Sequence, residues 1–441
     1  MRHLDFSPLS AGEIAARLSD GTLSPADIAR GVIERHARLE PDLRAWSWFE
    51  PRQIERSYRD GPAPTDPRPG LLGVPVGVKD IIDVDGMPTG LGLPGAATPA
   101  ARHAACVELL RAAGAVPVGK TVTAELAFSH PGPTRNPHGP GHTPGGSSSG
   151  SAAAVAAGMV PLALGTQTGG SVIRPAAYCG VVGIKTSLNA VPSAGIAPVA
   201  DSLDCVGWFA RSVEDAILAA RVLLPWQDLA PRRPGNRLRV WRLDAMELGT
   251  LSPEARQALD EASAALRGAG CAVVEAPLAG LLPALAECHR RIMLHELART
   301  LLPILCTRGR ELSAAMLKAI DAGRSVTASQ YQEARHQVRE AHAALDARMR
   351  DFDLILTPSA AGEAPAGLHH TGDSTFNRVW SVLGWPAIHL PTAWSPRGLP
   401  VGVQLVGRQG EDEALLRHAQ ALHPLIDRRM PASRAQVPMA Q

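Results

Sequence analysis

The chain has 441 residues, 45% of them hydrophobic, and a formal net charge of +2, which together supply the core of a large globular protein. Because charges of both signs are scattered along the chain, it has no basic stripe of the kind that binds nucleic acid. The first residues lack an apolar signal segment and no run reaches about 18 apolar residues, so we expect a cytoplasmic protein without a membrane partner.

Two helices are predicted between residues 9 and 40. Ser10 and Glu13 form a capping box at the start of the first helix. Ser24, followed by Pro25, supplies the N-cap and the first helical position of the second. The sequence therefore predicts two consecutive helices in this segment.

Alternating helices and strands follow. The apolar run GVPVGVKDIIDV at 73–84 comes after a Pro-rich loop at 62–70 and is typical of a buried strand. A helix at 103–113 and a short strand at 115–118 continue the alternation, which indicates a mixed or parallel sheet covered by helices. Further predicted elements are a helix at 152–157, a strand at 160–164, a helix capped by Ser212 and Asp215, and a strand at 237–243.

The second half of the chain is predicted to be mainly helical at 253–350 and then to return to the sheet. Apolar runs typical of strands and one last helix end the chain, at 353–358, 386–391, 401–407 and 411–422. Strands at both ends with helices between them indicate a single α/β domain over residues 1–441 with a helical excursion. We expect its multi-stranded sheet to be mixed and mostly parallel.

Residues 129–151 form a loop dense in glycine, proline, serine and histidine, and a loop of this length inside a compact domain is usually functional. Within it, GSSSG at 146–150 formally matches the GxSxG motif, which would make Ser148 the nucleophile of an α/β-hydrolase. That motif needs a strand directly before it, and the upstream prolines disfavour one. His142, in the same loop, is a candidate catalytic base. We expect it instead to have a structural or substrate-lining role.

Lysine is rare in this chain: only four of the 44 basic residues are lysines, at positions 79, 120, 185 and 318. Unlike arginine, lysine can lose its proton when it is buried. Lys79 lies in the apolar run at 73–84, where burial would have to lower its pKa by about three units, or about 4 kcal/mol, to make it neutral at pH 7. The alternative is a strand-end lysine that reaches solvent or pairs with Asp80.

The stretch TGGS at 168–171 sets consecutive N–H groups on a backbone that glycine leaves free to turn. Such a turn can form a nest for the oxyanion that develops during acyl transfer. Because Ser171 ends the turn, the nucleophile and the oxyanion donors would come from the same few residues.

These stretches together resemble the amidase signature family. The resemblance runs from LSAGEIAARLSDGTLSP through GVPVGVKDIIDVDGMPT and HTPGGSSSGS to LPVGVQLVGRQGEDEALL, with a core signature at about 70–215. It implies the amidase signature fold, an α/β/α sandwich. It also implies an amidohydrolase that cleaves linear amides through an acyl-enzyme, without a metal or a cofactor, and releases a carboxylic acid together with ammonia or an amine.

The resemblance implies a triad without histidine. Ser171 matches the nucleophile, Ser147 the serine that follows a cis peptide bond, and Lys79 the base that acts through Ser147. It also assigns the oxyanion N–H groups to Thr168, Gly169 and Gly170, and supporting hydroxyls to Thr166 and Ser149.

Arg174 departs from the commoner family pattern. It stands three places after Ser171 instead of two, while Pro175 keeps its position. This arrangement resembles the malonamidase-type branch, in which the arginine binds a substrate carboxylate, a task that suits the guanidinium fork. We therefore expect a small amide that also carries a carboxylate. The alternative is an arginine that forms an ion pair or braces the backbone.

Other functions stay open at this point. A glutaminase-type subunit of a tRNA amidotransferase would share these motifs and would need partner subunits. A relative that only binds ligands is disfavoured by the intact triad residues. The expected partner is a small amide, and a homodimer is compatible with the sequence. The six cysteines are widely spaced without a CxxC pair, which indicates neither a zinc site nor a disulfide framework.

Overall fold

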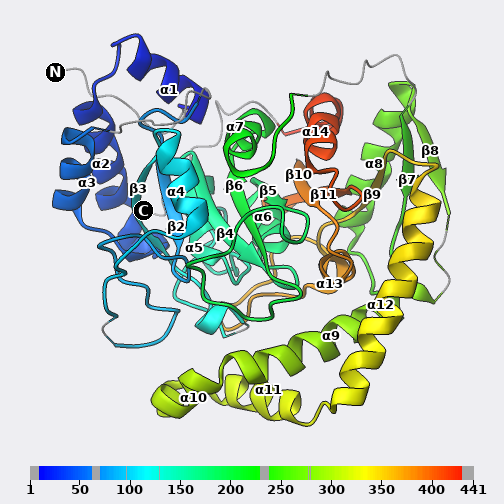
Figure 1. Cartoon of the computed structure of the whole chain (residues 1–441). Coiled ribbons are helices and arrows are strands. Elements are labelled where there is room, and N and C mark those ends of the chain that lie inside the picture. Colours follow the sequence, from blue (N-terminus) through cyan, green and yellow to red (C-terminus); the bar gives the residue numbers. More distant parts are fainter. Residues whose placement is uncertain are drawn as a thin grey trace.

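The computed structural model describes residues 9–61, 70–95, 97–128, 130–228, 238–276, 278 and 280–429. In this part of the chain, eleven strands form one sheet in the order β1-β3-β2-β4-β6-β5-β10-β11-β9-β7-β8 (Figure 1). The strands are β1 Trp46–Trp48, β2 Pro75–Lys79, β3 Val116–Thr121, β4 Leu162–Gln167, β5 Val182–Lys185, β6 Cys205–Ala210, β7 Arg239–Arg242, β8 Ala272–Glu275, β9 Leu354–Pro358, β10 Ala387–Trp394 and β11 Pro400–Val406.

Helices surround this sheet, and four of them, α9 to α12, form an arm that extends away from it (Figure 1). The helices are α1 Ala11–Ser19, α2 Pro25–Leu43, α3 Pro51–Arg59, α4 Ala105–Ala112, α5 Ser149–Ala156, α6 Ile173–Cys179, α7 Val213–Leu223, α8 Pro253–Gly268, α9 Leu281–Thr300, α10 Leu302–Arg308, α11 Ala314–Arg324, α12 Ala328–Met349, α13 Thr375–Val382 and α14 Asp412–Ile426.

The sheet is mixed, as expected, but it is not mostly parallel. Among the strands described, β2 pairs parallel with β3 and β4, and β7 pairs parallel with β8 and β9. The other six pairings are antiparallel and include all those of β5, β6, β10 and β11. Between β10 and β11 the chain has only residues 395–399, too few for the crossover that parallel pairing needs.

Adjacent residues of β6 show which helices cover each face. A Cβ on Gly207 would lie 3.1 Å from Val172, which precedes α6, whereas the indole of Trp208 donates to the Ala216 carbonyl of α7 at 3.1 Å. Because successive side chains of a strand point to opposite faces, α6 and α7 lie on opposite sides of the sheet. Helices α4 and α14 contact α7, and α5 contacts α6, so the architecture is an α/β/α sandwich.

Most predicted elements are present. The capping box of Ser10 and Glu13 and the Ser24 N-cap are confirmed, and Ser212 caps α7. The predicted strand at 73–84 is shorter than expected because the N–H groups of residues 81 and 82 turn back to the Lys79 carbonyl. Lys79 is therefore the last residue of β2.

The predictions differ from the structure in two other places. The segment 253–350 also contains β8, a short strand that follows a turn at Gly270 and joins the sheet edge beside β7. Helix α13, at Thr375–Val382, lies between two of the predicted strands, where no helix was predicted. Residues 62–69 of the Pro-rich loop, and residue 237 at the start of the predicted strand at 237–243, lie outside the described residues.

Candidate active site

The predicted site residues lie where parallel strands end. Lys79 is the last residue of β2. Thr166 is the residue before the last in β4, which pairs parallel with β2. Ser147 lies just before α5, and Ser171 just before α6. In α/β proteins, the carboxyl ends of strands are where ligands bind. The sheet therefore gathers four segments that are far apart in the sequence.

Lys79 is completely buried and its ammonium lies among hydroxyls. Its Nζ donates to Ser147 Oγ at 2.8 Å and to Thr166 Oγ1 at 2.8 Å, and it lies 3.4 Å from the Thr166 carbonyl. Burial lowers the pKa of Lys79 to about 7, partly opposed by the negative charge of Asp204 and reinforced by the positive charge of Arg174. A large fraction of Lys79 is thus neutral at pH 7.

The alternative in which Lys79 pairs with Asp80 is wrong. The carboxylate of Asp80 instead lies 3.1 Å from the ammonium of Lys120, which also donates to Thr89 Oγ1 at 2.9 Å. In the part of the chain that the structure describes, no carboxylate lies within ion-pair distance of Lys79. Lys120 of β3 pairs with Val78, the residue before Lys79 in β2. Because successive side chains of a strand point to opposite faces, the two buried lysines lie on opposite faces of the sheet and have different partners.

Ser147 follows a cis peptide bond with Gly146, as the resemblance implied. The next residue, Ser148, joins the two serine-bearing segments, because its N–H donates to the Ser171 carbonyl at 3.4 Å. Its hydroxyl donates to the Thr166 carbonyl at 3.3 Å. No strand directly precedes Ser148, so the α/β-hydrolase alternative is wrong.

The two hydroxyls expected to support the triad have different partners. Thr166 bonds Lys79, whereas the Ser149 hydroxyl donates to the Val122 carbonyl at 3.3 Å and so ties the start of α5 to the residue after β3. His142 lies in a turn where its N–H donates to the Gly139 carbonyl. In the described residues its ring has no hydrogen bond to Lys79, Ser147 or Ser171.

The turn at 168–170 is tied to several parts of the fold. His289 of α9 lies with Nε2 2.9 Å from the Thr168 carbonyl, and Ser381 of α13 donates to the Gly169 carbonyl at 2.8 Å. A Cβ on Gly170 would lie only 2.6 Å from Ser374 Cβ, so this position requires glycine. Helices α9 and α13 therefore close over the turn.

Gln167, which sequence reasoning missed, connects the two ends of this turn. Its Oε1 accepts the N–H groups of Val172 and Ile173 at 2.9 and 3.0 Å, and its Nε2 donates to Ser381 Oγ at 3.1 Å. The available signal was a polar residue at the end of a buried strand directly before TGGS. An uncharged amide there supplies both an acceptor and a donor.

Asp204 was also missed, although it stands in the polar start of the stretch DSLDCVGW at 201–208. Its carboxylate accepts the Thr168 hydroxyl at 2.5 Å and the N–H groups of Val199 and Ala200 at 2.7 and 3.0 Å. Burial raises the pKa of Asp204 to about 6, against these hydrogen bonds and the charge of Lys79. The residue therefore connects the turn at Thr168 with the electrostatics of Lys79.

Arg174 is buried and its guanidinium is occupied by backbone oxygens. Its Nε and one terminal nitrogen donate to the Gly146 carbonyl at 3.2 and 2.5 Å, and the other terminal nitrogen donates to the Gly372 carbonyl at 2.7 Å. Burial lowers the pKa of Arg174 to about 10. These contacts hold the carbonyl of the peptide that precedes Ser147.

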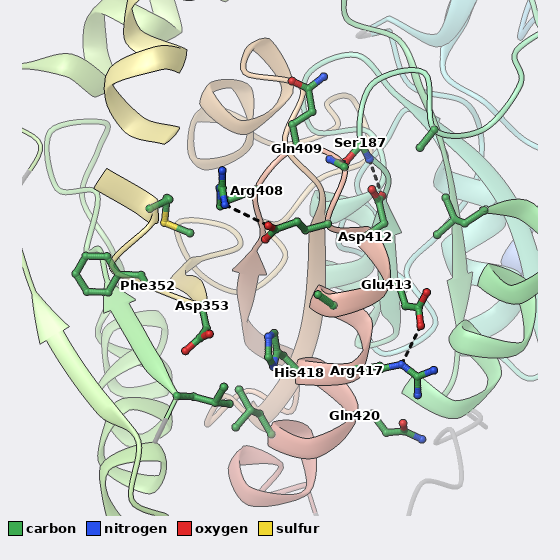
Figure 2. Close-up of a pocket in the computed structure, with 18 of the residues that line it drawn as sticks. Ser187, Phe352, Asp353, Arg408, Gln409, Asp412, Glu413, Arg417, His418 and Gln420 are labelled. Atoms are coloured by element: carbon green, nitrogen blue, oxygen red, sulfur yellow. Dashed lines mark hydrogen bonds and ion pairs between the residues drawn. The ribbon is translucent and has the colours of Figure 1, made fainter. Parts of the chain in front are cut away.

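A cavity of about 1400 Å³ lies elsewhere, beside α14 and the end of α12 (Figure 2). None of the predicted site residues lines it. Several of its polar side chains are already paired, such as Arg408 with Asp346 and Arg417 with Glu413, and Asp412 accepts the N–H of Ser187. The size of this cavity therefore gives no reason to move the candidate site.

Other features expected from the sequence concern metals, cysteines and membranes. In the described ranges, no three or more His, Cys, Asp or Glu side chains are grouped to hold a metal ion. All six cysteines are free thiols. None of the helices described combines the length and the apolar character that crossing a membrane would take.

The chain is similar to known proteins over most of its length. The profile of the family described as Amidase matches residues 27–416. A glutamyl-tRNA(Gln) amidotransferase subunit of Thermus thermophilus is 35% identical over 93% of this chain and 96% of its own. Amidase 1 of Oryza sativa subsp. japonica is 32% identical over 83% and 94%, and an acylamidase of Rhodococcus erythropolis is 30% identical over 96% and 97%.

Solved structures show the same fold. The 6-aminohexanoate cyclic dimer hydrolase matches with a TM-score of 0.86 at 26% identity and covers 98% of this chain and 99% of its own. A structure described as an amidase matches with a TM-score of 0.84 at 29% identity, over 95% and 100% of the two chains. The large mixed sheet with its covering helices is thus shared with amide-cleaving enzymes.

Proposed function

Because this chain belongs to the amidase family, we propose that it hydrolyses linear amides through a triad of Ser171, Ser147 and Lys79. The observation that carries this proposal is the direct contact between the buried amine of Lys79 and the Ser147 hydroxyl. A buried lysine that has no carboxylate partner among the described residues and is hydrogen-bonded to a serine hydroxyl is suited to proton transfer rather than to ion pairing.

In the proposed first step, neutral Lys79 takes a proton from Ser147, which takes one from Ser171. The Ser171 oxygen attacks the amide carbonyl carbon and forms a tetrahedral intermediate. The N–H groups of Thr168, Gly169 and Gly170 stabilise its oxyanion. Because Lys79 and Ser147 are already hydrogen-bonded, this route activates the nucleophile without a histidine.

In the second step, the intermediate collapses. The C–N bond breaks as Ser147 returns a proton to the leaving nitrogen, and ammonia or an amine departs. Water, activated through the same serine and lysine, then attacks the ester carbonyl of the acyl-enzyme. A carboxylic acid is released and Ser171 recovers its proton.

A screen of small amides that measures released ammonia tests this function, with a fluorophosphonate probe as a second readout. Ser171→Ala should abolish both hydrolysis and labelling, whereas Ser148→Ala should still be labelled. Labelling of Ser148 in the Ser171→Ala variant would contradict the assignment. Activity of the parent chain without any labelling at Ser171 would also contradict it.

A second candidate is a glutaminase-type subunit of an amidotransferase. It is favoured by the 35% identity with the amidotransferase subunit of Thermus thermophilus, which covers nearly all of both chains. Such a protein would form a complex with partner subunits and release ammonia from glutamine. Expression in its own host, affinity purification of the tagged chain and identification of the bound proteins distinguish the two functions.

The narrower prediction of a carboxylate-bearing substrate stays a prediction. The donors of Arg174 are directed at the Gly146 and Gly372 carbonyls, which favours the alternative of a backbone-bracing arginine. The same screen answers this point when each neutral amide is paired with an analogue that carries a second carboxylate.

A further inference from the structure

The turn at 168–170 carries the proposed oxyanion donors. Two of its carbonyl groups accept hydrogen bonds from side chains of two helices in the second half of the chain. His289 comes from α9 and Ser381 from α13. Each bonds a different carbonyl, that of Thr168 and that of Gly169. Both side chains are completely buried.

Peptide geometry gives these two bonds a specific consequence. In a trans peptide, the carbonyl of one residue and the N–H of the next lie in one plane and point in opposite directions. A bond to the Thr168 carbonyl therefore sets the direction of the Gly169 N–H. A bond to the Gly169 carbonyl sets the direction of the Gly170 N–H in the same way.

The glycines make this external support necessary. Gly169 and Gly170 restrict their own backbone angles less than any other residue would, so the turn alone does not hold its N–H groups in one orientation. Oxyanion donors act through preorganisation, which means that they must already point at the site where the charge develops. Side chains outside the turn have to supply that rigidity.

The tautomer and the protonation state of the His289 ring both suit a hydrogen-bond donor to the Thr168 carbonyl. Because the Thr168 carbonyl can only accept, Nε2 must carry the hydrogen, and Nδ1 has no partner in the described residues. Burial lowers the pKa of His289 to about 4, so the ring is neutral across the physiological range. This leaves a single fixed N–H aimed at the turn.

Ser381 belongs to a longer chain of bonds. It donates to the Gly169 carbonyl and accepts from Gln167 Nε2, and Gln167 Oε1 holds the N–H groups at the start of α6. The turn is thus fixed to strand β4 before it, to helix α6 after it and to α13 above it.

We propose that His289 and Ser381 are positioning residues that aim the Gly169 and Gly170 N–H groups at the oxyanion by holding the carbonyls of the same peptide planes. This inference rests on the proposed amidase function. It assigns to the helical excursion and to α13 a part in transition-state stabilisation that the triad motifs alone do not reveal.

The experiment compares His289→Phe, which removes the donor, with His289→Gln, which keeps an N–H donor. Kinetics use the neutral amide that the parent hydrolyses fastest, and phenylboronic acid serves as a probe that forms a tetrahedral adduct on Ser171. We expect His289→Phe to lower kcat about 10- to 100-fold with little change in KM, because misaimed donors act on the transition state. Inhibition by the boronic acid should weaken by a similar factor.

His289→Gln should recover most of the lost kcat. His295→Phe is the matched control, since His295 lies on the same helix and its Nδ1 lies 3.1 Å from the Val326 carbonyl, away from the turn. Ser381→Ala repeats the test independently, with Ser263→Ala as its control, because the Ser263 hydroxyl donates only within α8. Both controls should retain the kcat of the parent.

A His289→Phe or Ser381→Ala variant with the kcat and boronic-acid affinity of an active parent would overturn this proposal and leave the amidase function standing. Equal losses in the Phe and Gln variants would also overturn it, because they would indicate a packing role. A parent that neither hydrolyses amides nor reacts with a fluorophosphonate at Ser171 would overturn both proposals.

Discussion

The charge of Lys79 is decided by its surroundings at the scale of single residues. The sequence contains four lysines, and three of them are completely buried. Lys120 has the Asp80 carboxylate beside it, whereas Lys79 has two hydroxyls and no carboxylate within ion-pair distance among the described residues. Two hydroxyls stabilise an ammonium group less than a carboxylate would. The effect of burial therefore dominates the pKa of Lys79, and its amine can act as a base near neutral pH.

Lys79→Met should abolish hydrolysis and should change the pH dependence of stability. Burial lowers the pKa of Lys79 from 10.5 to about 7, so the parent chain bears the full cost of this group below pH 7, roughly 3 to 6 kcal/mol. The cost falls as pH rises from 7 to 10.5. Urea unfolding of both proteins should therefore show the parent gaining stability relative to the variant between pH 7 and pH 10; a constant difference would contradict this.

Asp204→Asn should move the pH profile of catalysis. The negative charge of Asp204 raises the pKa of Lys79, so its removal should shift the acidic limb of kcat/KM to lower pH by about one unit. The amide can still accept from Val199 and Ala200 and can donate to the Thr168 hydroxyl. The measurement is kcat/KM from pH 5 to pH 9, and a limb that stays in place or moves upward would contradict the prediction.

Arg174→Ala should reduce activity on neutral and carboxylate-bearing amides by the same factor. Its bonds to Gly146 and Gly372 hold the backbone next to Ser147, and a displaced serine lowers the rate about 100-fold on any substrate. The ratio of kcat/KM for the paired amides is the quantity to measure. A loss confined to the carboxylate-bearing amide would instead support substrate recognition by Arg174.

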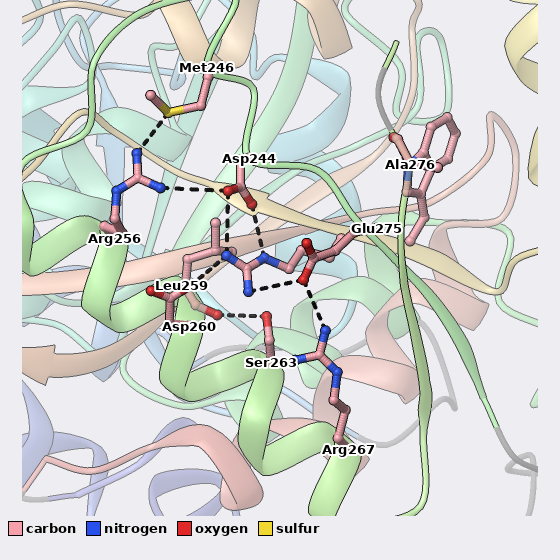
Figure 3. A network of polar contacts seen from close by, with 11 residues as sticks. Asp244, Met246, Arg256, Leu259, Asp260, Ser263, Arg267, Glu275 and Ala276 are labelled. Atoms are coloured by element: carbon pink, nitrogen blue, oxygen red, sulfur yellow. Dashed lines mark hydrogen bonds and ion pairs between the residues drawn. The ribbon is translucent and has the colours of Figure 1, made fainter.

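At the scale of elements, a network of ion pairs fastens α8 to the sheet edge (Figure 3). Arg242 of β7 bonds Asp244 at 2.9 Å and Asp260 of α8 at 2.5 Å, and it lies 3.5 Å from Glu275 of β8. The arginine is largely buried, whereas its three acidic partners are partly exposed. One buried cation thus connects two strands and a helix.

Arg242→Met should destabilise the protein by about 1 to 2 kcal/mol, because it leaves several carboxylates together without their central cation but with access to solvent. The activity should stay unchanged, since none of the candidate site residues touches this network. Arg290→Met, which removes an exposed pair with Glu287 within α9, is the control and should have little effect on unfolding. Equal stabilities of the two variants would contradict the prediction.

At the scale of the whole molecule, one continuous sheet links both halves of the chain. β6 and β5 from the first half pair with each other, and β5 pairs with β10 from the second half. The helical segment 253–350 leaves this sheet and returns to it. A single domain over residues 1–441 therefore remains our prediction.

This prediction implies one cooperative unfolding transition. Trp208 of β6 and Trp241 of β7 are both buried, so tryptophan fluorescence reports on both halves of the sheet. Its change in urea should coincide with the loss of helix measured by far-ultraviolet circular dichroism. A helical signal that is lost at a separate urea concentration would indicate an independent unit.

Much of the local structure was predictable. Local signals predicted the helix caps at Ser10 and Ser24 and the end of the helix at 103–113 before the strand at 115–118. These signals depend on residues a few positions apart, so the sequence contains all the information they need. The sheet was correctly expected to be mixed, but its many antiparallel pairings were not expected. For strands such as β5 and β10, the direction of pairing depends on where the chain returns after a long excursion, and no short pattern records that.

The sequence by itself determined the family of this protein, the candidate triad of Lys79, Ser147 and Ser171, and the glycine-rich turn, because these features are short motifs whose chemistry depends on residue type. Only the tertiary structure decided that Lys79 has hydroxyls and no carboxylate beside it among the described residues, that Arg174 binds backbone carbonyls, and that His289, Ser381 and Asp204 surround the turn. The physical reason is that hydrogen-bond partners and burial arise from segments far apart in the chain, which only the packed sheet and helices bring into contact.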